Sequence, residues 1–124
     1  MKKLLCSLFA LSAVSTAMAQ EVNIKLLGTS DIHGRVVPWS YGADVEDKSG
    51  SYAQIATYVK DVRKNNKNVV LVDVGDAIQD NQVDVFAKDK KYYKDHPIPK
   101  VLNEMKYDIF VLGNHEFNFG MKAL

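Results

Sequence analysis

The chain has 124 residues, of which 47% are apolar and 25% are charged, and its formal net charge is +1 at pH 7. This length allows one domain at most, and the composition is close to that of an average soluble globular protein, which excludes a disordered tail, a collagen-like chain and a disulfide-dense miniprotein. The near-zero charge excludes a broad basic surface, so we expect no nucleic-acid partner.

Residues 1–19 have the three regions of a secretory signal peptide. Two lysines precede an apolar stretch at residues 4–14, and Ala17 and Ala19 are small residues that favour cleavage after Ala19. A bilayer needs about 20 apolar residues, so this stretch is too short to serve as a stable membrane anchor. We expect export to the periplasm or the medium, with loss of Cys6, the only cysteine. A metal in the mature chain must then use Asp, Asn, His or Glu.

Three short apolar runs predict strands at residues 22–27, 69–72 and 109–112. The first run alternates roughly between apolar and polar residues, whereas the other two are continuously apolar. Continuous runs of this length are typical of strands that are covered on both faces, as in a parallel sheet. Two long connections, at about residues 34–50 and 77–96, are of a length that is more often functional than idle.

Helical patterns separate the three predicted strands. Apolar residues recur at helical spacing from Tyr52 to Val62, and Ser51 with Gln54 has the pattern of a capping box. A second pattern runs from Ile98 to Met105, where prolines are tolerated only in the first turn. The order β-α-β-α-β predicts an α/β fold with a parallel sheet and right-handed crossovers.

Polar residues that can bind metal follow all three predicted strands. They are Asp31 and His33 after the first strand, Asp76 after the second, and Asn114, His115 and Glu116 after the third. Ligands gather beyond the carboxyl ends of parallel strands. Singly, each group is as typical of a turn or a helix cap as of a site, but together they indicate a common site. Two divalent ions there could activate water and hold a phosphoryl oxygen, and a nearby histidine could protonate a departing oxygen.

Three motifs resemble those of the calcineurin-like metallophosphoesterases, namely Asp31-Ile32-His33, Gly75-Asp76 and Gly113-Asn114-His115-Glu116. Residues 29–34 and 113–120 resemble the exported nucleotidase branch, which includes 5′-nucleotidases, UDP-sugar hydrolases and 2′,3′-cyclic-nucleotide 2′-phosphodiesterase/3′-nucleotidases. Parts of the stretch 96–108 look most like the cyclic phosphodiesterases. The resemblance implies that residues 20–124 are the N-terminal β-α-β-α-β part of a metallophosphoesterase sandwich.

The resemblance also implies a role for each motif residue. Asp31 and His33 would hold one divalent ion, Asp76 would bridge two ions, and Asn114 would hold the second. His115 would be the catalytic residue beside the leaving group. The metals are left open among Mn, Zn, Fe, Co and Mg, because all of these accept such ligands to some degree.

The chain departs from the family pattern in two ways. The 5′-nucleotidases have an Asp three residues after the catalytic histidine to orient it, and Asn118 stands there instead, which favours the cyclic phosphodiesterase branch. The family's further metal-binding histidines do not occur in these 124 residues, and four ligands are too few for two ions. We expect His96 to be a loop residue near a helix N-terminus, and Glu116 to make a structural hydrogen bond. We also expect this chain to be an N-terminal fragment without turnover on its own.

The favoured function is metal-dependent hydrolysis of nucleotide phosphoesters, with a small-molecule nucleotide as substrate. A 5′-nucleotidase or UDP-sugar hydrolase with the same core is the near alternative, and an exported, non-catalytic binding module is an alternative of another class. The sequence has no Gly-x-Gly-x-x-Gly, no Gly-Lys-Ser/Thr phosphate loop and no Gly-x-Ser-x-Gly elbow, which argues against other enzyme types. Base and sugar specificity and the oligomeric state stay open.

Overall fold

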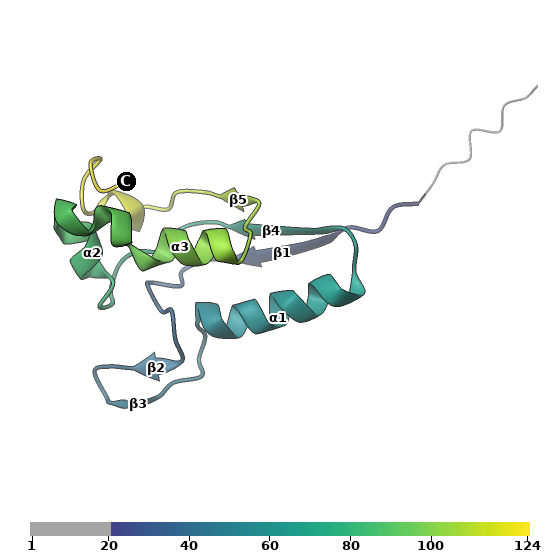
Figure 1. Cartoon of the computed structure of the whole chain (residues 1–124), viewed down its shortest axis with the longest axis horizontal. Helices are drawn as coiled ribbons and strands as arrows, with labels where there is room; N and C mark the ends of the chain where they lie inside the picture. The colour runs from purple at the N-terminus through teal and green to yellow at the C-terminus, as the bar shows by residue number, and fades with distance from the viewer. Residues whose placement is uncertain (1–20) are drawn as a thin grey trace, which may run out of the picture.

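A parallel three-stranded sheet forms the centre of the computed structural model, which describes residues 21–124 (Figure 1). The strand order is β1 (Lys25–Thr29), β4 (Val69–Asp73) and β5 (Ile109–Phe110). Both strand pairs are parallel, which confirms the predicted α/β class with its parallel sheet. The predicted signal peptide at residues 1–19 lies outside the described residues.

The two crossover helices, α1 (Tyr52–Asn65) and α3 (Pro97–Glu104), begin with side-chain caps. The hydroxyl of Ser51 accepts a hydrogen bond from the backbone N–H of Gln54 at 3.4 Å, as the capping pattern predicts. At α3, Nδ1 of His96 accepts from the backbone N–H of Ile98 at 3.2 Å. His96 therefore lies at a helix N-terminus as expected, and it has the specific role of a cap.

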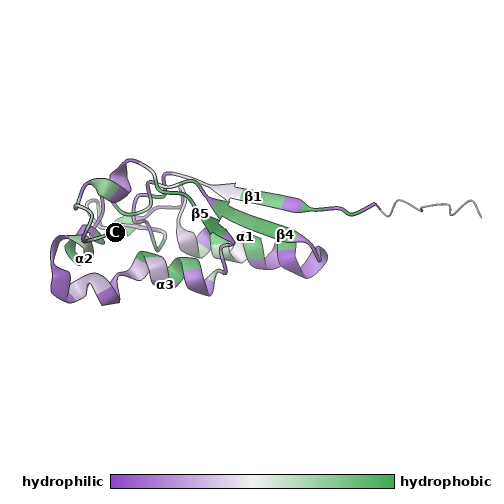
Figure 2. Ribbon diagram, turned by 90° about the horizontal axis from the view of Figure 1, so that it is seen from above, coloured by the Kyte–Doolittle hydropathy of each residue, from purple (hydrophilic) through white to green (hydrophobic). Residues whose placement is uncertain are grey.

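Both helices pack on one face of the sheet, where Leu71 of β4 is fully buried between side chains of α1 and α3 (Figures 1 and 2). Two right-handed crossovers that advance in the same direction place both helices on the same side. The opposite face, onto which Figure 2 looks, exposes Leu26, Val74 and Ile109 by 71%, 53% and 52%. The prediction that the two continuously apolar strands are covered on both faces is therefore wrong within residues 21–124.

The strand bounds differ from those predicted because pairing, rather than apolar character, defines them. β1 pairs with β4 from Lys25↔Val69 to Thr29↔Asp73, so residues 22–24 have no partner on β4. β5 has only two residues, although the backbone N–H of Val111 still donates to the carbonyl of Asp73 at 2.8 Å. The chain beyond β5 thus stays attached to the end of β4.

The two long connections contain short elements of secondary structure. The first holds an antiparallel pair, β2 (Trp39–Ser40) and β3 (Val45–Glu46). The second holds a short helix, α2 (Asp84–Lys88), and a 3-10 helix, η1 (Lys90–Asp95). A last 3-10 turn, η2 (His115–Phe117), follows β5.

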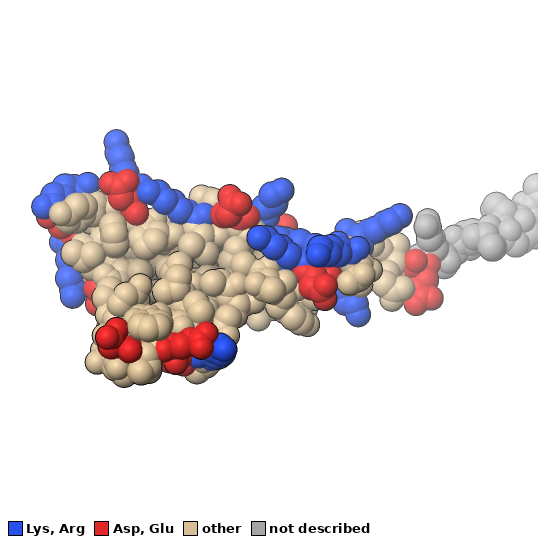
Figure 3. All heavy atoms as spheres, turned by 60° about the horizontal axis from the view of Figure 1, so that its bottom comes forward, with Lys and Arg blue, Asp and Glu red and all other residues tan. Residues whose placement is uncertain are grey.

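The surface of the described part carries charges of both signs. Figure 3 shows Lys and Arg side chains interspersed with Asp and Glu around a largely uncharged central area of the face it presents. Among residues 21–124, the structure has no helix with both the length and the apolar character needed to cross a bilayer.

Candidate functional site

The loops after β1 and β4 run side by side at the carboxyl edge of the sheet. The backbone N–H of Asp31 donates to the carbonyl of Gly75 at 3.0 Å, and that of His33 donates to the carbonyl of Asp76 at 3.0 Å. These two bonds continue the parallel pairing of the strands into the loops. They bring the first two predicted motifs together through the backbone.

The loop after β5 packs against the same place through two glycines. A Cβ atom at Gly75 would overlap the backbone of Gly113, and one at Gly113 would overlap Asp76. Any larger residue would push the loops apart, so the glycines permit this close approach. The backbone N–H of His115 then donates to Oδ1 of Asp76 at 2.8 Å. All three strand ends therefore meet at one edge.

The buried side chain of Glu116 connects the loops after β4 and β5 by hydrogen bonds. The residue is 1% exposed, and its carboxylate accepts backbone hydrogen bonds from Asp76 at 2.8 Å, Ala77 at 2.7 Å and Gly113 at 2.6 Å. Hydrogen bonds to an ionised acceptor are stronger than those between neutral groups. The expected structural hydrogen bond of Glu116 is present, and it joins the loops after β4 and β5.

The backbone at this edge has an unusual conformation. Six non-glycine residues of the described chain have positive φ, and four of them lie here: Asp31, His33, Asp76 and Asp80, with φ of 55°, 48°, 59° and 72°. The left-handed region is disfavoured for residues with a side chain, at a cost of order 1–3 kcal/mol each. Such residues gather at functional sites, where the surrounding structure holds them in place.

His33 lies between two carboxylates. Its Nε2 is 3.9 Å from Oδ1 of Asp31, and its Nδ1 is 3.6 Å from Oδ2 of Asp80. Nδ1 is buried and lacks a hydrogen-bond partner among the described residues. His33, Asp80 and His115 each offer one ligand atom, and these three atoms lie within 4.8 Å of one another. Imidazole and carboxylate donors at this spacing fit a divalent cation.

The structure places the predicted site residues at one edge, but not all in one compact group. Asp31, His33 and Asp76 are joined through the two neighbouring loops, and His115 reaches Asp76 through its backbone. Asn114 is exposed and directly precedes His115 at the start of η2. The compact group instead includes Asp80, which could not be predicted because it stands in a long loop without a recognisable motif.

A second missed residue, Gln79, contacts the imidazole of His115. Its Oε1 is 2.7 Å from Nδ1 of His115, and Nδ2 of Asn118 is 3.0 Å from the same nitrogen. The rings of His115 and His33 meet edge to face, with centroids 5.1 Å apart. The imidazole of His115 is thus held from two sides, by the loop after β4 and by the histidine after β1.

The buried carboxyl group of Asp73 stabilises the turn at the end of β4. Asp73 is fully buried and accepts hydrogen bonds from the hydroxyl of Thr29 at 2.6 Å and from the backbone of Gly75 at 2.8 Å. Burial raises the pKa of Asp73, although these hydrogen bonds oppose the change. The adjacent Tyr52 also has a raised pKa, chiefly because it is buried. Asp73 thereby fixes the turn that presents Gly75 and Asp76.

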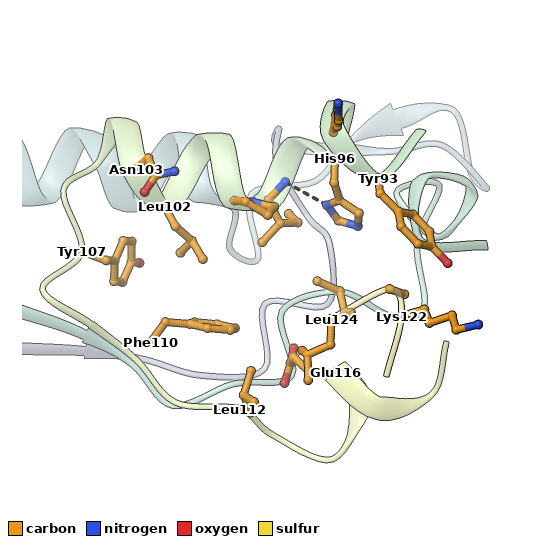
Figure 4. A pocket seen from close by; sticks show the side chains of 15 residues that line it. Tyr93, His96, Leu102, Asn103, Tyr107, Phe110, Leu112, Glu116, Lys122 and Leu124 are labelled. Carbon is orange, nitrogen blue, oxygen red and sulfur yellow. Dashed lines mark hydrogen bonds between the residues drawn. The ribbon is translucent and has the colours of Figure 1, made fainter. Parts of the chain in front are cut away.

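An apolar cavity of about 700 Å³ lies between α3 and the residues up to Leu124 (Figure 4). Leu102, Phe110 and Leu112 line it, and Glu116 reaches its edge. None of the five predicted site residues lines this cavity. Its walls are mainly apolar, so it differs in chemistry from the polar edge where the three loops meet.

Comparisons with known proteins agree with this geometry. A family model described as calcineurin-like phosphoesterase matches residues 24–124. The chain is 40% identical over 114 residues to the trifunctional nucleotide phosphoesterase protein YfkN of Bacillus subtilis. It is 36% identical over 123 residues to a 2′,3′-cyclic-nucleotide 2′-phosphodiesterase/3′-nucleotidase of Haemophilus influenzae, and 33% identical over 104 residues to a snake venom 5′-nucleotidase of Naja atra.

The matches cover most of this chain but little of the relatives. They cover 86%, 95% and 82% of the chain, yet only 8%, 19% and 18% of these three relatives. The crystal structure of the calcineurin-like phosphoesterase YfkN from Bacillus subtilis superposes with a TM-score of 0.72 at 39% identity. That superposition covers 81% of this chain and 32% of the solved chain.

Proposed function

Because the chain belongs to the calcineurin-like phosphoesterase family, we propose that it supplies metal ligands and a catalytic histidine for the hydrolysis of nucleotide phosphoesters. One observation carries this proposal: Nδ1 of His33 is buried, lacks a hydrogen-bond partner among residues 21–124, and faces a carboxylate oxygen at 3.6 Å. A divalent cation would satisfy both groups. The names of the three relatives support a nucleotide as the substrate.

We propose that Asp31 and His33 hold one divalent ion and that Asn114 holds a second. Asp76 would bind both ions. The joined loops after β1 and β4 support a shared role for Asp31, His33 and Asp76. Asp80 is a further carboxylate within reach, since its Oδ2 is 3.6 Å from Nδ1 of His33. When bound, such ions supply an activated water and positive charge at the phosphoryl group.

His115 is the proposed catalytic residue. Its backbone bond to Asp76 and its contact with Gln79 fix both ends of the residue, so the ring has a defined position beside the proposed ligands. An imidazole in this place can give a proton to the oxygen that leaves the phosphorus. Positioning the ring in advance lowers the entropic cost of that proton transfer.

We further propose that residues 1–19 direct export and that residues 20–124 are the N-terminal part of a larger phosphoesterase domain. The four proposed ligands of this chain are too few for two ions, so other ligands must come from elsewhere. The relatives' greater lengths are consistent with this. Within the nucleotidases, Asn118 in place of an Asp favours the 2′,3′-cyclic phosphodiesterase and 3′-nucleotidase activities over 5′-nucleotidase activity.

The decisive experiment measures hydrolysis with the chain alone and with the chain joined to the downstream part of the Bacillus subtilis phosphoesterase. The substrates are 2′,3′-cyclic AMP, 3′-AMP, 5′-AMP and UDP-glucose, each with Mn²⁺ and with EDTA. We expect EDTA-sensitive turnover from the joined protein, and most of it with the first two substrates. His115→Ala should lose most of this turnover while its metal content stays nearly normal.

The controls separate the possible failures. The unaltered Bacillus subtilis protein shows that the assay works, and circular dichroism shows that the joined protein is folded. A folded joined protein that hydrolyses none of the four substrates, with or without Mn²⁺, would refute the hydrolase proposal and favour a non-catalytic binding module. Loss of metal in His115→Ala would instead make His115 a ligand.

A further inference from the structure

Gln79 lies in the loop after β4, three residues beyond Asp76, and is only partly exposed. Its side chain turns to the loop after β5, where its Oε1 is 2.7 Å from Nδ1 of His115. An amide oxygen accepts hydrogen bonds and cannot donate one. A contact at this distance therefore requires a proton on Nδ1 of His115.

Asn118 completes the arrangement around the same oxygen. Its Nδ2 donates a hydrogen bond to Oε1 of Gln79. Nδ2 also lies 3.0 Å from Nδ1 of His115, where it could donate only to an unprotonated nitrogen, so we assign the proton from the shorter contact of 2.7 Å with Gln79. Oε1 of Gln79 thus accepts from two donors, which satisfies both of its lone pairs. Asn118 holds Gln79 in place, and Gln79 in turn holds the imidazole.

We propose that Gln79 is the positioning residue of His115: its Oε1 keeps the proton of the neutral imidazole on Nδ1 and leaves Nε2 as the nitrogen that exchanges a proton with the substrate. The role of Nε2 rests on the proposed function, whereas the tautomer does not. Which ring nitrogen of a histidine is protonated is set by the hydrogen bond that the other nitrogen makes.

In the observed orientation, Asn118 presents its amide nitrogen rather than its amide oxygen to His115. The Nδ2 group of Asn118 can only donate, so it cannot accept the Nδ1 proton of His115. Gln79 supplies the missing acceptor from a different loop, and it does so as a neutral group. The ring is therefore oriented without a further carboxylate beside Asp76 and Asp80.

The test measures the ¹⁵N chemical shifts of the histidine side chains by NMR, on the 124-residue chain at about pH 8, above the reference pKa of about 6.5 for a free imidazole. His115 should show a protonated Nδ1 and an unprotonated Nε2. His96 provides an internal reference for the other tautomer. Its Nδ1 accepts a hydrogen bond from the backbone N–H of Ile98, so the proton of its neutral ring must lie on Nε2. The measurement is made without metal and repeated with diamagnetic Zn²⁺.

Three variants connect the tautomer to Gln79. Gln79→Leu removes the acceptor and should move His115 toward a mixture of tautomers or toward Nε2–H. Gln79→Glu retains an acceptor oxygen and should restore the Nδ1–H signals. Gln82→Leu is the matched control, because Gln82 is an exposed glutamine of the same loop, and its replacement should leave His115 unchanged.

The outcomes distinguish this inference from the proposed function, since no turnover is measured. An Nε2–H tautomer of His115 in the unaltered chain would overturn the proposal, because it means that Gln79 presents its amide nitrogen to Nδ1. Unchanged His115 signals in Gln79→Leu would also overturn it. The His96 signals show whether each variant remains folded, so a general unfolding is recognised as such.

Discussion

Glu116 accepts a hydrogen bond at 2.8 Å from the backbone N–H of Asp76, a residue 40 positions earlier in the chain. With the bonds from Ala77 and Gly113, it fixes the loop after β4 to the loop after β5. A carboxylate in this place cannot be exchanged for an apolar side chain without leaving three backbone donors unpaired. The relative position of two proposed ligands, Asp76 and Asn114, thus depends on a residue that is not itself a proposed ligand.

We predict that Glu116→Leu lowers the free energy of unfolding by about 3 kcal/mol, because an unpaired buried donor costs about 1–3 kcal/mol. Urea denaturation of the 124-residue chain measures this. Glu104→Leu is the matched control, since Glu104 is an exposed glutamate of α3 and should change the stability little. Equal midpoints for the two variants would show that the three hydrogen bonds contribute nothing.

The free energy of unfolding of Asp73→Asn, relative to that of the unaltered chain, should increase as the pH rises. Burial raises the pKa of Asp73 above its ordinary value of 3.8, so the folded state favours the protonated form. The stabilising contribution of the protonated carboxyl is complete below pH 3.8 and is lost as the pH rises through the raised pKa. Asparagine is neutral throughout and avoids this loss.

Denaturant titrations at about pH 3.5 and about pH 7, on either side of the transition, measure the difference between Asp73→Asn and the unaltered chain. Taking the difference cancels the titration of other carboxylates, which the two proteins share. A difference that is the same at both pH values would contradict the raised pKa.

The unaltered chain should lose stability in mild acid when His96 is protonated, and His96→Asn should not show this loss. Burial lowers the pKa of His96 below its ordinary value of 6.5, although Asp84 opposes the change. The contribution to stability is present above pH 6.5 and is lost as the pH falls through the lowered pKa. Protonation of Nδ1 also ends the cap on the backbone N–H of Ile98.

Thermal melts at about pH 7.5 and about pH 5 test this prediction for His96. The unaltered chain should lose more stability between the two values than His96→Asn, since asparagine is a good cap without a titratable ring. His96→Ala separates the two effects, because it lacks both the cap and the titration. An identical acid response of the unaltered chain and His96→Asn would exclude His96 as the cause.

Replacement of His33 should weaken metal binding. In the proposed site, His33→Ala removes the imidazole that faces the carboxylates of Asp31 and Asp80. We expect a loss of Zn²⁺ or Mn²⁺ affinity of about tenfold or more by calorimetry on the 124-residue chain. His96→Asn serves as the control because His96 lies at the start of α3, outside the compact group. Equal affinities in both variants would remove His33 from the site.

The sequence predicted the order of the main elements because their patterns are local. Helical spacing marked α1 and α3, and the buried strand β4 appears as a continuous apolar run. Strand bounds were less well predicted, since a strand ends where its partner ends. The bare face of the sheet was missed for a related reason: an apolar run shows that a strand avoids water, but it does not show what covers it.

The place of the motif residues at one edge of the sheet could be predicted from the sequence because each follows closely after a strand. Asp80 and Gln79 were not found, because they stand in a long loop and their contacts are with residues far along the chain. Such contacts depend on the path of the loop and on positive φ at several residues, which no local spacing encodes. They are properties of the folded loop alone.

By itself, the amino-acid sequence determined the α/β class and the identity of the polar residues at the strand ends, since hydrophobic spacing and residue chemistry act over short distances. Only the tertiary structure decided that Glu116 locks two loops, that His33 faces two carboxylates and that Gln79 holds His115. Those arrangements arise when parallel pairing brings distant loops within hydrogen-bonding range, where the burial of polar atoms requires each of them to find a partner.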